Sequence, residues 1–306
     1  MASDRTKIWV LNLAIVLSGL FLSLPIANAL LVWLAQVALI ILIVRYRYTF
    51  TVLPALMAFA MVMIVYGWQA CLVYCYLVLL PGVLMGYKAR TYSTPQAVIL
   101  WGFGPYLLPI ILTIIYYAQL GEQIPAMVAQ MQAMLETGAH QLGVSGGELE
   151  AMLVSARKVV EWMVRLLPGI LFTMFLGLAL FAYIGASAVN SFFGAVFPRT
   201  SALYLWKANE FWLVPLAVAL GFVLLGNNML KIIGENFLVF LVHLYAFYGI
   251  CFFDYYFKKA NIPLPIRIII YAILLVAVIV AIPALAVVAV IDSRFDFRKI
   301  GLQSEE

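Results

Sequence analysis

Two polar side chains stand inside the otherwise apolar run 233–257, where they could contact a bound solute. Asn236 and His243 are seven residues apart, a spacing that puts them on nearly one face of a helix. An amide can orient a ligand, an imidazole can change protonation near neutral pH, and the ring of Tyr248 could wall a pocket. Because polar groups are costly in a bilayer, we predict a substrate-binding set of Asn236, His243 and Tyr248. The alternative is that His243 only hydrogen-bonds a neighbouring helix.

Charged residues accompany this set at both ends of the same run. Lys231 and Glu235 are four residues apart and could form an ion pair along the helix. Tyr245 and Asp254 follow toward the other end. The simplest interpretation of Asp254 is a position at the membrane interface.

Two serine motifs suggest nucleophilic catalysis, and each departs from the pattern it would need. Segment 185–188 contains Ser187 and, together with His243, loosely resembles the Ser/His dyad of rhomboid intramembrane proteases, which carry glycine at the position of Ala188. Segment 143–147 fits G-x-S-x-G without the preceding strand that a nucleophile elbow requires. No P-loop, H-E-x-x-H or dinucleotide fingerprint occurs. We therefore expect a protein that is not an enzyme and needs no cofactor, with an intramembrane serine protease as a minor alternative.

The three cysteines predict neither a disulfide framework nor a metal site. Cys71 and Cys75 lie in one apolar run, and Cys251 lies in another. The C-x-x-x-C spacing has no histidine near it in sequence, so buried free thiols are the expected state.

Further amides and small residues indicate where helices meet. Amides inside lipid commonly hydrogen-bond between helices, and we predict this role for Asn12, Gln36, Gln69 and Asn190. Ala14 and Ser18 make a small-residue face where another helix can approach closely. That helix can belong to this chain or to a partner protein, so both residues are candidate docking positions.

Charges of alternating sign follow the last apolar run. They are Asp292, Arg294, Asp296 and Arg298. This pattern favours local ion pairs that fix the tail at the interface. The alternative is a docking patch for another protein, formed by Asp292, Asp296 and Arg298.

Composition identifies the surroundings in which these residues act. Of 306 residues, 66% are hydrophobic and 10% are charged, against about 45–50% and about 25% in soluble domains. Seven stretches contain no charged residue, and a bilayer core requires about 20 such residues per helix. The sequence therefore predicts an all-α polytopic bundle in contact with the lipid bilayer. The net charge of +5 comes from short basic clusters between apolar runs, which indicates membrane topology and no nucleic-acid partner.

The apolar runs divide into about nine transmembrane helices, with eight to ten as the range. Pro25 and Gly67 each split a long run into a helical hairpin. The predicted helices are 8–24, 26–44, two within 50–87, 96–119, 166–193, 211–228, 233–257 and 266–291. The chain thus has an N-terminal membrane half over 1–119, a polar insert over 120–165, a C-terminal membrane half over 166–291 and a charged tail over 292–306.

Basic residues predict which side of the membrane each connection faces. The positive-inside rule places the basic connections, and the N-terminus with them, in the cytoplasm. These clusters are Arg5/Lys7, Arg45/Arg47, Lys88/Arg90, Arg199/Lys207 and Lys258/Lys259/Arg267. We expect a multi-pass protein of the bacterial cytoplasmic (inner) membrane. Nine crossings would put the tail outside although Arg294, Arg298 and Lys299 flank it, so either one segment is miscounted or the tail is an exception.

The insert lies outside the cytoplasm in this topology. Apolar residues recur at helical spacing in two parts of it, 127–135 and 149–163. Ser145 and Glu148 form a capping box that starts the second part. We expect two amphipathic helices that pack on the membrane surface or on the protein itself. The alternatives are a lid over a pocket and a docking face.

The second half, about residues 165–300, resembles the YybS-like family of bacterial membrane proteins. The resemblance is carried by Pro198-Arg199, Phe211-Trp212 with Pro215, Asn236, the Gly249 region, and Asp292 followed by Asp296-Phe297-Arg298-Lys299. The family has no established activity, and its helical layout is similar to the substrate-binding subunits of energy-coupling-factor vitamin transporters. That likeness implies that small residues of the first helix, here Ala14 and Ser18, dock a scaffold subunit.

Two functions remain open from the sequence. The first is a non-enzymatic subunit that binds or transports a small-molecule substrate near Asn236 and His243, with the insert as a lid. The second is an accessory or scaffold subunit of a bacterial envelope complex, which docks a protein partner through the insert or the tail.

Overall fold

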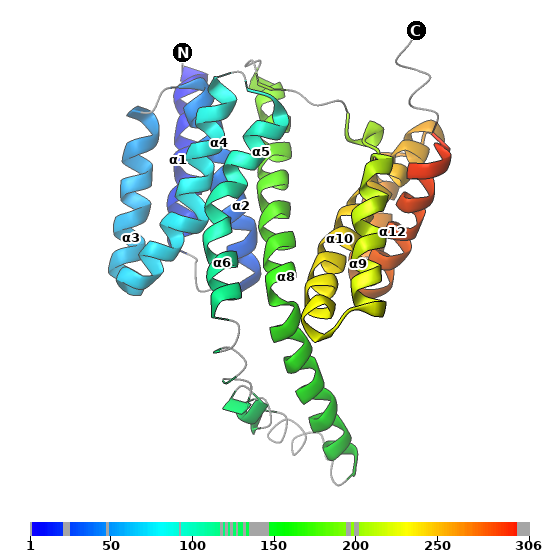
Figure 1. Ribbon diagram of the computed structural model, residues 1–306. Coiled ribbons are helices and arrows are strands. Elements are labelled where there is room, and N and C mark those ends of the chain that lie inside the picture. Colours follow the sequence, from blue (N-terminus) through cyan, green and yellow to red (C-terminus); the bar gives the residue numbers. More distant parts are fainter. Residues whose placement is uncertain are drawn as a thin grey trace. The chain divides into compact units, whose positions relative to one another are not determined.

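The computed structural model describes residues 2–20, 25–46, 49–91, 93–116, 147–193, 197–198 and 202–298, with scattered positions between 119 and 134 (Figure 1). The regular structure in these residues is helical, and they contain no strand. The prediction of an all-α membrane protein is therefore confirmed. The chain divides into two compact units. Unit 1 is Met1–Pro109 with Met174–Thr200, and unit 2 is Ile110–Thr173 with Ser201–Glu306.

Unit 1 consists of the first five helices, the start of a sixth and the second half of α8. The bounds are α1 Ala2–Leu20, α2 Pro25–Arg45, α3 Thr49–Tyr74, a π-helical turn Cys75–Leu79, α4 Leu80–Arg90, α5 Pro95–Phe103, a 3-10 turn Gly104–Tyr106 and α6 Leu107–Ile115. The two predicted hairpin breaks are present. Pro25 starts α2, and Gly67 interrupts α3 at a φ of 83°, a value that residues with a Cβ avoid. The chain reverses there and returns toward α4 (Figure 1).

The central helix of unit 1 is α2, whose residues 35–43 are all buried. One part of its surface packs with Ile15 of α1 and Tyr74 of α3. Another part packs with Met85 of α4 and Tyr183 of α8. A helix that is apolar all round is typical of such a buried position. Unit 1 is therefore organised around α2.

The predicted helix 96–119 is two helices joined by a tight turn. Thr94 caps the first of them, α5, because its hydroxyl accepts a hydrogen bond from the N–H of Ala97 at 3.3 Å. Pro95 then occupies the first helical turn, where its missing N–H costs nothing. Pro105 lies in the 3-10 turn that separates α5 from α6. The two segments still form one apolar span, Pro95–Ile115.

The helix that the sequence divides at residue 165 is continuous in the structure. α8 runs over Gly147–Phe193, 47 residues, and contains Pro168 in its interior. Its first part belongs to unit 2 and its second part to unit 1. The second amphipathic helix of the insert and the predicted helix 166–193 are thus one element. Ser145 of the predicted capping box, most of 117–146, and the basic residues Arg47, Arg199 and Lys299 lie outside the described residues.

Unit 2 also contains the last four helices of the chain. They are α9 Leu213–Leu225, α10 Asn228–Lys259, α11 Leu264–Val276 and α12 Val278–Phe295, preceded by the 3-10 turns Leu203–Leu205 and Glu210–Trp212. α10 packs on α12 at Gly249, where a Cβ would lie 2.3 Å from the carbonyl oxygen of Leu285. Tyr245 and Leu285 belong to the apolar core between these helices. Only glycine permits this approach.

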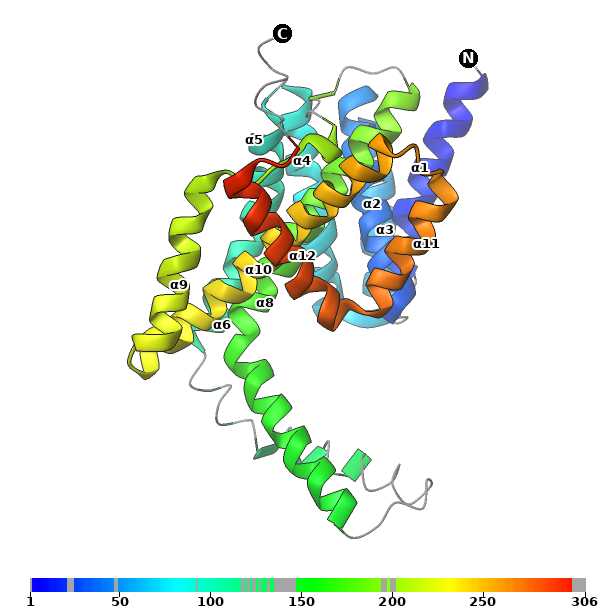
Figure 2. The same cartoon turned by 90° about the vertical axis from the view of Figure 1, so that its right-hand side faces the viewer.

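The predicted helix 266–291 is a hairpin of two helices, α11 and α12, which turn at Ala277 (Figure 2). The hairpin brings the end of α12 back to the end of α10. The hydroxyl groups of Tyr255 and Tyr256 donate to the carbonyls of Arg298 and Phe297 at 3.2 and 3.3 Å. The end of α12 therefore lies at the same end of unit 2 as Lys258 and Lys259.

Five helical segments in the described part of the chain are long and apolar enough to cross a membrane. They are Thr51–Arg90, Pro95–Ile115, Glu150–Asn190, Asn228–Lys259 and Val278–Phe295. Four shorter apolar helices accompany them, namely Ile8–Ser18, Leu31–Arg45, Glu210–Leu225 and Leu264–Leu274. Many of their apolar side chains are exposed, as contact with lipid requires. The chain is a multi-pass membrane protein.

Candidate functional site

Pro168 interrupts the hydrogen-bond ladder of α8, and Asn236 of α10 bonds to the turn around it. Proline has no N–H to donate to the carbonyl four residues earlier, and its ring crowds that carbonyl. Oδ1 of Asn236 accepts from the backbone N–H of Gly169 at 2.7 Å, and Nδ2 donates to the backbone carbonyl of Arg165 at 3.0 Å. These two backbone groups pair with each other in a regular α-helix. One amide side chain therefore takes up both groups beside the break.

The donors of Asn236 are fully used within the chain. Its Nδ2 also donates to the carbonyl of Ile232, one turn earlier on α10, at 2.9 Å. An amide nitrogen has two N–H groups, so only one lone pair of Oδ1 is left for a ligand. Asn236 joins α8 to α10, as the sequence predicted for the other amides. Its role in binding a substrate stays a prediction.

Gly169 allows α10 to approach the broken turn of α8. A Cβ at this position would lie 2.6 Å from the backbone oxygen of Asn236 and 3.0 Å from its Cα. Contacts that short with backbone atoms would push the two helices apart. The Pro-Gly pair thus has two functions: proline opens the ladder, and glycine admits the helix that satisfies it.

An ion pair lies one turn away from this amide. Nε of Arg165 is 2.5 Å from Oε2 of Glu235, so the structure pairs Glu235 with α8. The ion pair of Glu235 with Lys231 along α10 stays a prediction. Lys231 is exposed in the first turn of α10. Two basic groups and one acidic group therefore gather where α10 begins.

A groove opens beside the Asn236 contact, and it lies wholly within unit 2. Its volume is about 180 Å³. It is lined by Ile110 and Ile114 of α6, by Pro168, Gly169 and Phe172 of α8, and by Asn236, Phe237 and Phe240 of α10. The rings of Phe172 and Phe240 meet edge to face, with centroids 4.8 Å apart. Apart from the amide, every lining residue is apolar.

The other two members of the predicted substrate set lie outside the groove lining. His243 is exposed on α10, and its Nδ1 lies 2.7 Å from the carbonyl oxygen of Val239 on the same helix. Tyr248 is half-buried, with its ring 5.8 Å from that of Phe247. The structure thus does not gather the three predicted residues into one lining. Ligand binding by His243 and Tyr248 stays a prediction.

Asp254 is tied to the start of α11. Its carboxylate lies 3.5 Å from Arg267 and 3.2 Å from Lys258, and it accepts a hydrogen bond from the Tyr271 hydroxyl at 3.4 Å. These contacts hold α10 and α11 together at the basic end of unit 2. They fit the predicted position of Asp254 at the interface.

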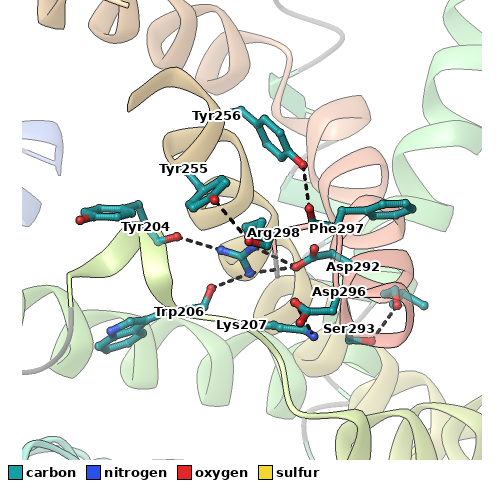
Figure 3. Close-up of polar contacts among 11 residues, drawn as sticks. Tyr204, Trp206, Lys207, Tyr255, Tyr256, Asp292, Ser293, Asp296, Phe297 and Arg298 are labelled. Carbon is teal, nitrogen blue, oxygen red and sulfur yellow. Dashed lines mark hydrogen bonds and ion pairs between the residues drawn. The ribbon is translucent and has the colours of Figure 1, made fainter. Parts of the chain in front are cut away.

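The closing Asp-x-x-x-Asp-Phe-Arg motif contains a buried latch, the ion pair of Asp292 with Arg298 (Figure 3). Asp292 and Arg298 are 1% and 2% exposed, and Oδ2 of Asp292 lies 2.9 and 3.0 Å from two guanidinium nitrogens. The same guanidinium donates to the carbonyls of Tyr204 and Trp206, each at 2.9 Å. Asp296 adopts left-handed φ and ψ of 44° and 54° and turns the chain back. The charged side chains of Asp292 and Arg298 therefore face the interior of their own chain.

Two further ion pairs surround this latch, one partly buried and one exposed. Lys207 lies 3.0 Å from Asp296, and Arg294 lies 3.4 Å from Glu210. The interpretation of the tail charges as local ion pairs matches these contacts. Docking of a partner on Asp292, Asp296 and Arg298 stays a prediction, but the first and last of them would have to leave their buried pair.

The small-residue face of α1 packs on α3 of the same chain. Ser18 is fully buried, donates to the carbonyl of Ile15 at 2.7 Å and lies 2.8 Å from the Tyr74 hydroxyl. Ala14 is partly buried against the same apolar cluster. The close approach that the sequence predicts at this face thus occurs within unit 1. Docking of a scaffold subunit there stays a prediction.

Gln36 shows the predicted use of a buried amide between helices. Its Nε2 donates to the carbonyl of Leu77 and to the Tyr106 hydroxyl, both at 2.7 Å, and Tyr106 donates to the same carbonyl at 2.8 Å. Leu77 belongs to the π-helical turn, where the regular backbone pairing changes. Side chains thus satisfy an irregular backbone in both units.

The remaining candidates for chemistry are the cysteines and the pair of Ser187 with His243. Cys71 and Cys251 are buried free thiols, as expected, whereas Cys75 is partly exposed. Ser187 is partly buried and belongs to unit 1, whereas His243 belongs to unit 2. Within the described residues, no three histidine, cysteine, aspartate or glutamate side chains are grouped as metal ligands.

The groove residues that sequence reasoning missed are apolar. Pro168, Gly169, Phe172 and Phe240 lie in runs where apolar residues are the rule, so their type carries no signal. A proline followed by glycine inside a predicted helix is the one available pointer, because it marks a backbone break that must be satisfied elsewhere.

These features define a polytopic helical membrane protein with an apolar groove beside a proline break. The sequence matches the family described as "Predicted membrane protein (DUF2232)" over residues 12–293, and the chain belongs to this family. The match includes both membrane halves. No curated protein and no solved structure matches the chain. Membership therefore gives the membrane class and no activity.

Proposed function

We propose that this protein is a non-enzymatic binding subunit of the bacterial cytoplasmic membrane, and that its ligand site is the groove between α6, α8 and α10. The observation that supports this is the groove itself, at about 180 Å³, beside the break at Pro168. Both helix breaks and the spaces between helices of a bundle are usual places for ligand sites in membrane proteins.

The chemistry of the groove favours an apolar ligand. Sites for drug-sized solutes occupy about 300–1,000 Å³ and carry several polar groups that fix orientation. This groove is smaller, and its single polar side chain, Asn236, has both donors engaged. A vitamin-sized polar substrate, which the likeness to energy-coupling-factor subunits would imply, fits the groove less well than an apolar chain does.

The distribution of basic residues supports a cytoplasmic location for the ends of α10 and α12. Lys207, Lys258, Arg267 and Arg294 gather at that end of unit 2, and in unit 1 Arg90 donates to the carbonyl of Ile43 near the end of α2. The positive-inside rule assigns such ends to the cytoplasm. The division of the last run into α11 and α12 supports a cytoplasmic side for the tail, the same side that the basic residues favour for the N-terminus.

A pair of isoleucines on α6 provides the test of the groove. Ile114 lines the groove and is 57% exposed, whereas Ile111, at 49%, is not among its lining residues. Ile114→Trp fills the groove, and Ile111→Trp adds the same indole to the same helix. Native mass spectrometry of gently extracted protein should show an adduct with an apolar chain that I114W loses and I111W keeps. Equal retention in both variants, or no adduct in the wild type, would overturn the proposal.

An accessory subunit of an envelope complex is the second candidate, and one part of α8 favours it. Before residue 165 this helix runs past the α9–α10 turn of the same unit (Figure 1). Its exposed apolar side chains include Met152, Val159, Trp162 and Met163, and exposed apolar patches of this kind mark contact sites. Val159→Glu with Met163→Glu should release a defined partner while the groove adduct persists. Unchanged partner retention would exclude this surface.

A further inference from the structure

We infer that the ligand of the groove is an anionic glycerophospholipid, with one acyl chain against Phe172 and Phe240 and its phosphate at Arg165 and Lys231. This inference rests on the proposed binding function of the groove and adds the chemical class of the ligand. It follows from the way charged and apolar residues succeed each other along two parallel helices.

The two walls of the groove run in the same direction from a charged end to an apolar end. On α8 the order is Arg165, then the Pro-Gly break, then Phe172, and on α10 it is Glu235, Asn236, then Phe240. The Arg165–Glu235 pair, the Gly169–Asn236 contact and the edge-to-face phenylalanine pair connect these levels in turn. Seven residues of helix separate Arg165 from Phe172, which is about 10 Å. A ligand lying along the groove therefore has one polar end and one apolar end.

The apolar end suits part of an acyl chain. A water molecule occupies about 30 Å³ in the liquid. The groove volume of about 180 Å³ therefore holds about six groups of that size. Ile114 and Phe237 are 57% and 54% exposed at the groove, so the remainder of a longer chain can continue into the surrounding lipid. A polar solute would gain no donors there, because those of Asn236 are already engaged.

The polar end suits a phosphate. The charges of Arg165, Lys231 and Glu235 sum to +1. These residues lie where the apolar parts of α8 and α10 begin. The guanidinium of Arg165 has five N–H groups, and its ion pair with Glu235 engages the Nε position. Its side chain is 35% exposed, so the remaining donors can reach a phosphate at the membrane surface.

Two lysines at opposite ends of α10 provide a variant and its control for a general attraction between basic residues and anionic lipid. Lys231 lies at the groove end, whereas Lys259 lies at the other end, and both are exposed. The full-length protein is placed in nanodiscs of phosphatidylcholine that contain a small fraction of phosphatidylglycerol, and retained lipid is counted by native mass spectrometry. We expect phosphatidylglycerol to be enriched around the wild-type protein. Lys231→Gln should lower this enrichment about fivefold, which corresponds to the binding free energy that one basic residue contributes at an anionic surface. Lys259→Gln should leave the enrichment unchanged.

The groove variants make every outcome decisive. Loss of phosphatidylglycerol in both I114W and K231Q, with retention in I111W and K259Q, supports the inference. A different apolar adduct that I114W loses and K231Q keeps overturns the lipid assignment and leaves the binding function standing. Phosphatidylglycerol retained equally by all four variants, or no retained ligand at all, overturns both.

Discussion

The side-chain oxygen of Asn236 accepts a hydrogen bond from the backbone N–H of Gly169 at 2.7 Å, across two helices whose sequence positions are 67 residues apart. The same amide donates to the carbonyl of Arg165. Irregular backbone inside a membrane requires partners from protein, because lipid offers none. This contact therefore explains how a long helix can contain Pro168 and still belong to a membrane-spanning segment.

Asn236→Leu should destabilise the protein because it leaves the Gly169 N–H and the Arg165 carbonyl without their side-chain partner. The loss in unfolding free energy should be about 2 kcal/mol, within the range for unsatisfied buried groups. Asn228→Leu, at the exposed start of the same helix, is the matched control and should change stability little. Melting temperature in detergent measures both, and equal melting of N236L and wild type would contradict the proposed role of the amide.

Two glycines of α8 should respond oppositely to the same substitution. Gly169→Ala places a Cβ 2.6 Å from the backbone oxygen of Asn236, whereas Gly177→Ala meets nothing within 4 Å. The first should cost about 1–3 kcal/mol by forcing the helices apart. The second should stabilise the helix by up to about 1 kcal/mol, because alanine restricts the unfolded chain. Thermal unfolding of the pair tests the close approach, and a neutral G169A would refute it.

Much of the fold was predictable from the helix-breaking residues, proline and glycine, within the apolar runs. Pro25 and Gly67 are strong breakers, and both break the chain as predicted. Pro168 is also a breaker, but α8 continues through it because Asn236 satisfies the turn. Ala277 ends α11 without any breaker residue, while Pro283 lies inside α12. Local propensity thus predicts a helix break correctly where no side chain of another helix bonds to the interrupted backbone.

The candidate site was less predictable than the fold. Asn236 stood out because amides are rare in apolar runs, and it does line the groove. The phenylalanines opposite it carry no such signal, because their pairing depends on how α8 and α10 pack. The tail charges predicted local ion pairs, but their burial with the carbonyls of Tyr204 and Trp206 depends on a loop that is about 90 residues distant in sequence.

The buried and exposed arginines of the tail should differ greatly in their contribution to stability. Arg298→Met leaves the carboxylate of Asp292 buried without its counter-charge and should cost about 3–5 kcal/mol. Arg294→Met removes an exposed ion pair with Glu210 and should cost about 0–1 kcal/mol.

A double variant separates charge from packing in this latch. Asp292→Leu combined with Arg298→Met removes both buried charges, so it should recover part of the stability that R298M loses. Chemical unfolding in detergent measures all three variants. If R298M and R294M were equally stable, or if the double variant were the least stable of all, the buried ion pair would not be the element that fixes the tail.

The α11–α12 hairpin predicts that the ends of α10 and α12 face the same side of the membrane. A single straight helix over 266–291 would put them on opposite sides, whereas a hairpin returns the chain to the face it left. Single cysteines at Ala260, Phe295 and Asn228, in a background with Cys71, Cys75 and Cys251 replaced by serine, distinguish the two arrangements. A membrane-impermeant thiol reagent added to sealed inverted vesicles should label A260C and F295C together and spare N228C. Labelling of F295C only in right-side-out vesicles, together with N228C, would show that the hairpin is wrong and that the basic tail lies outside the cytoplasm.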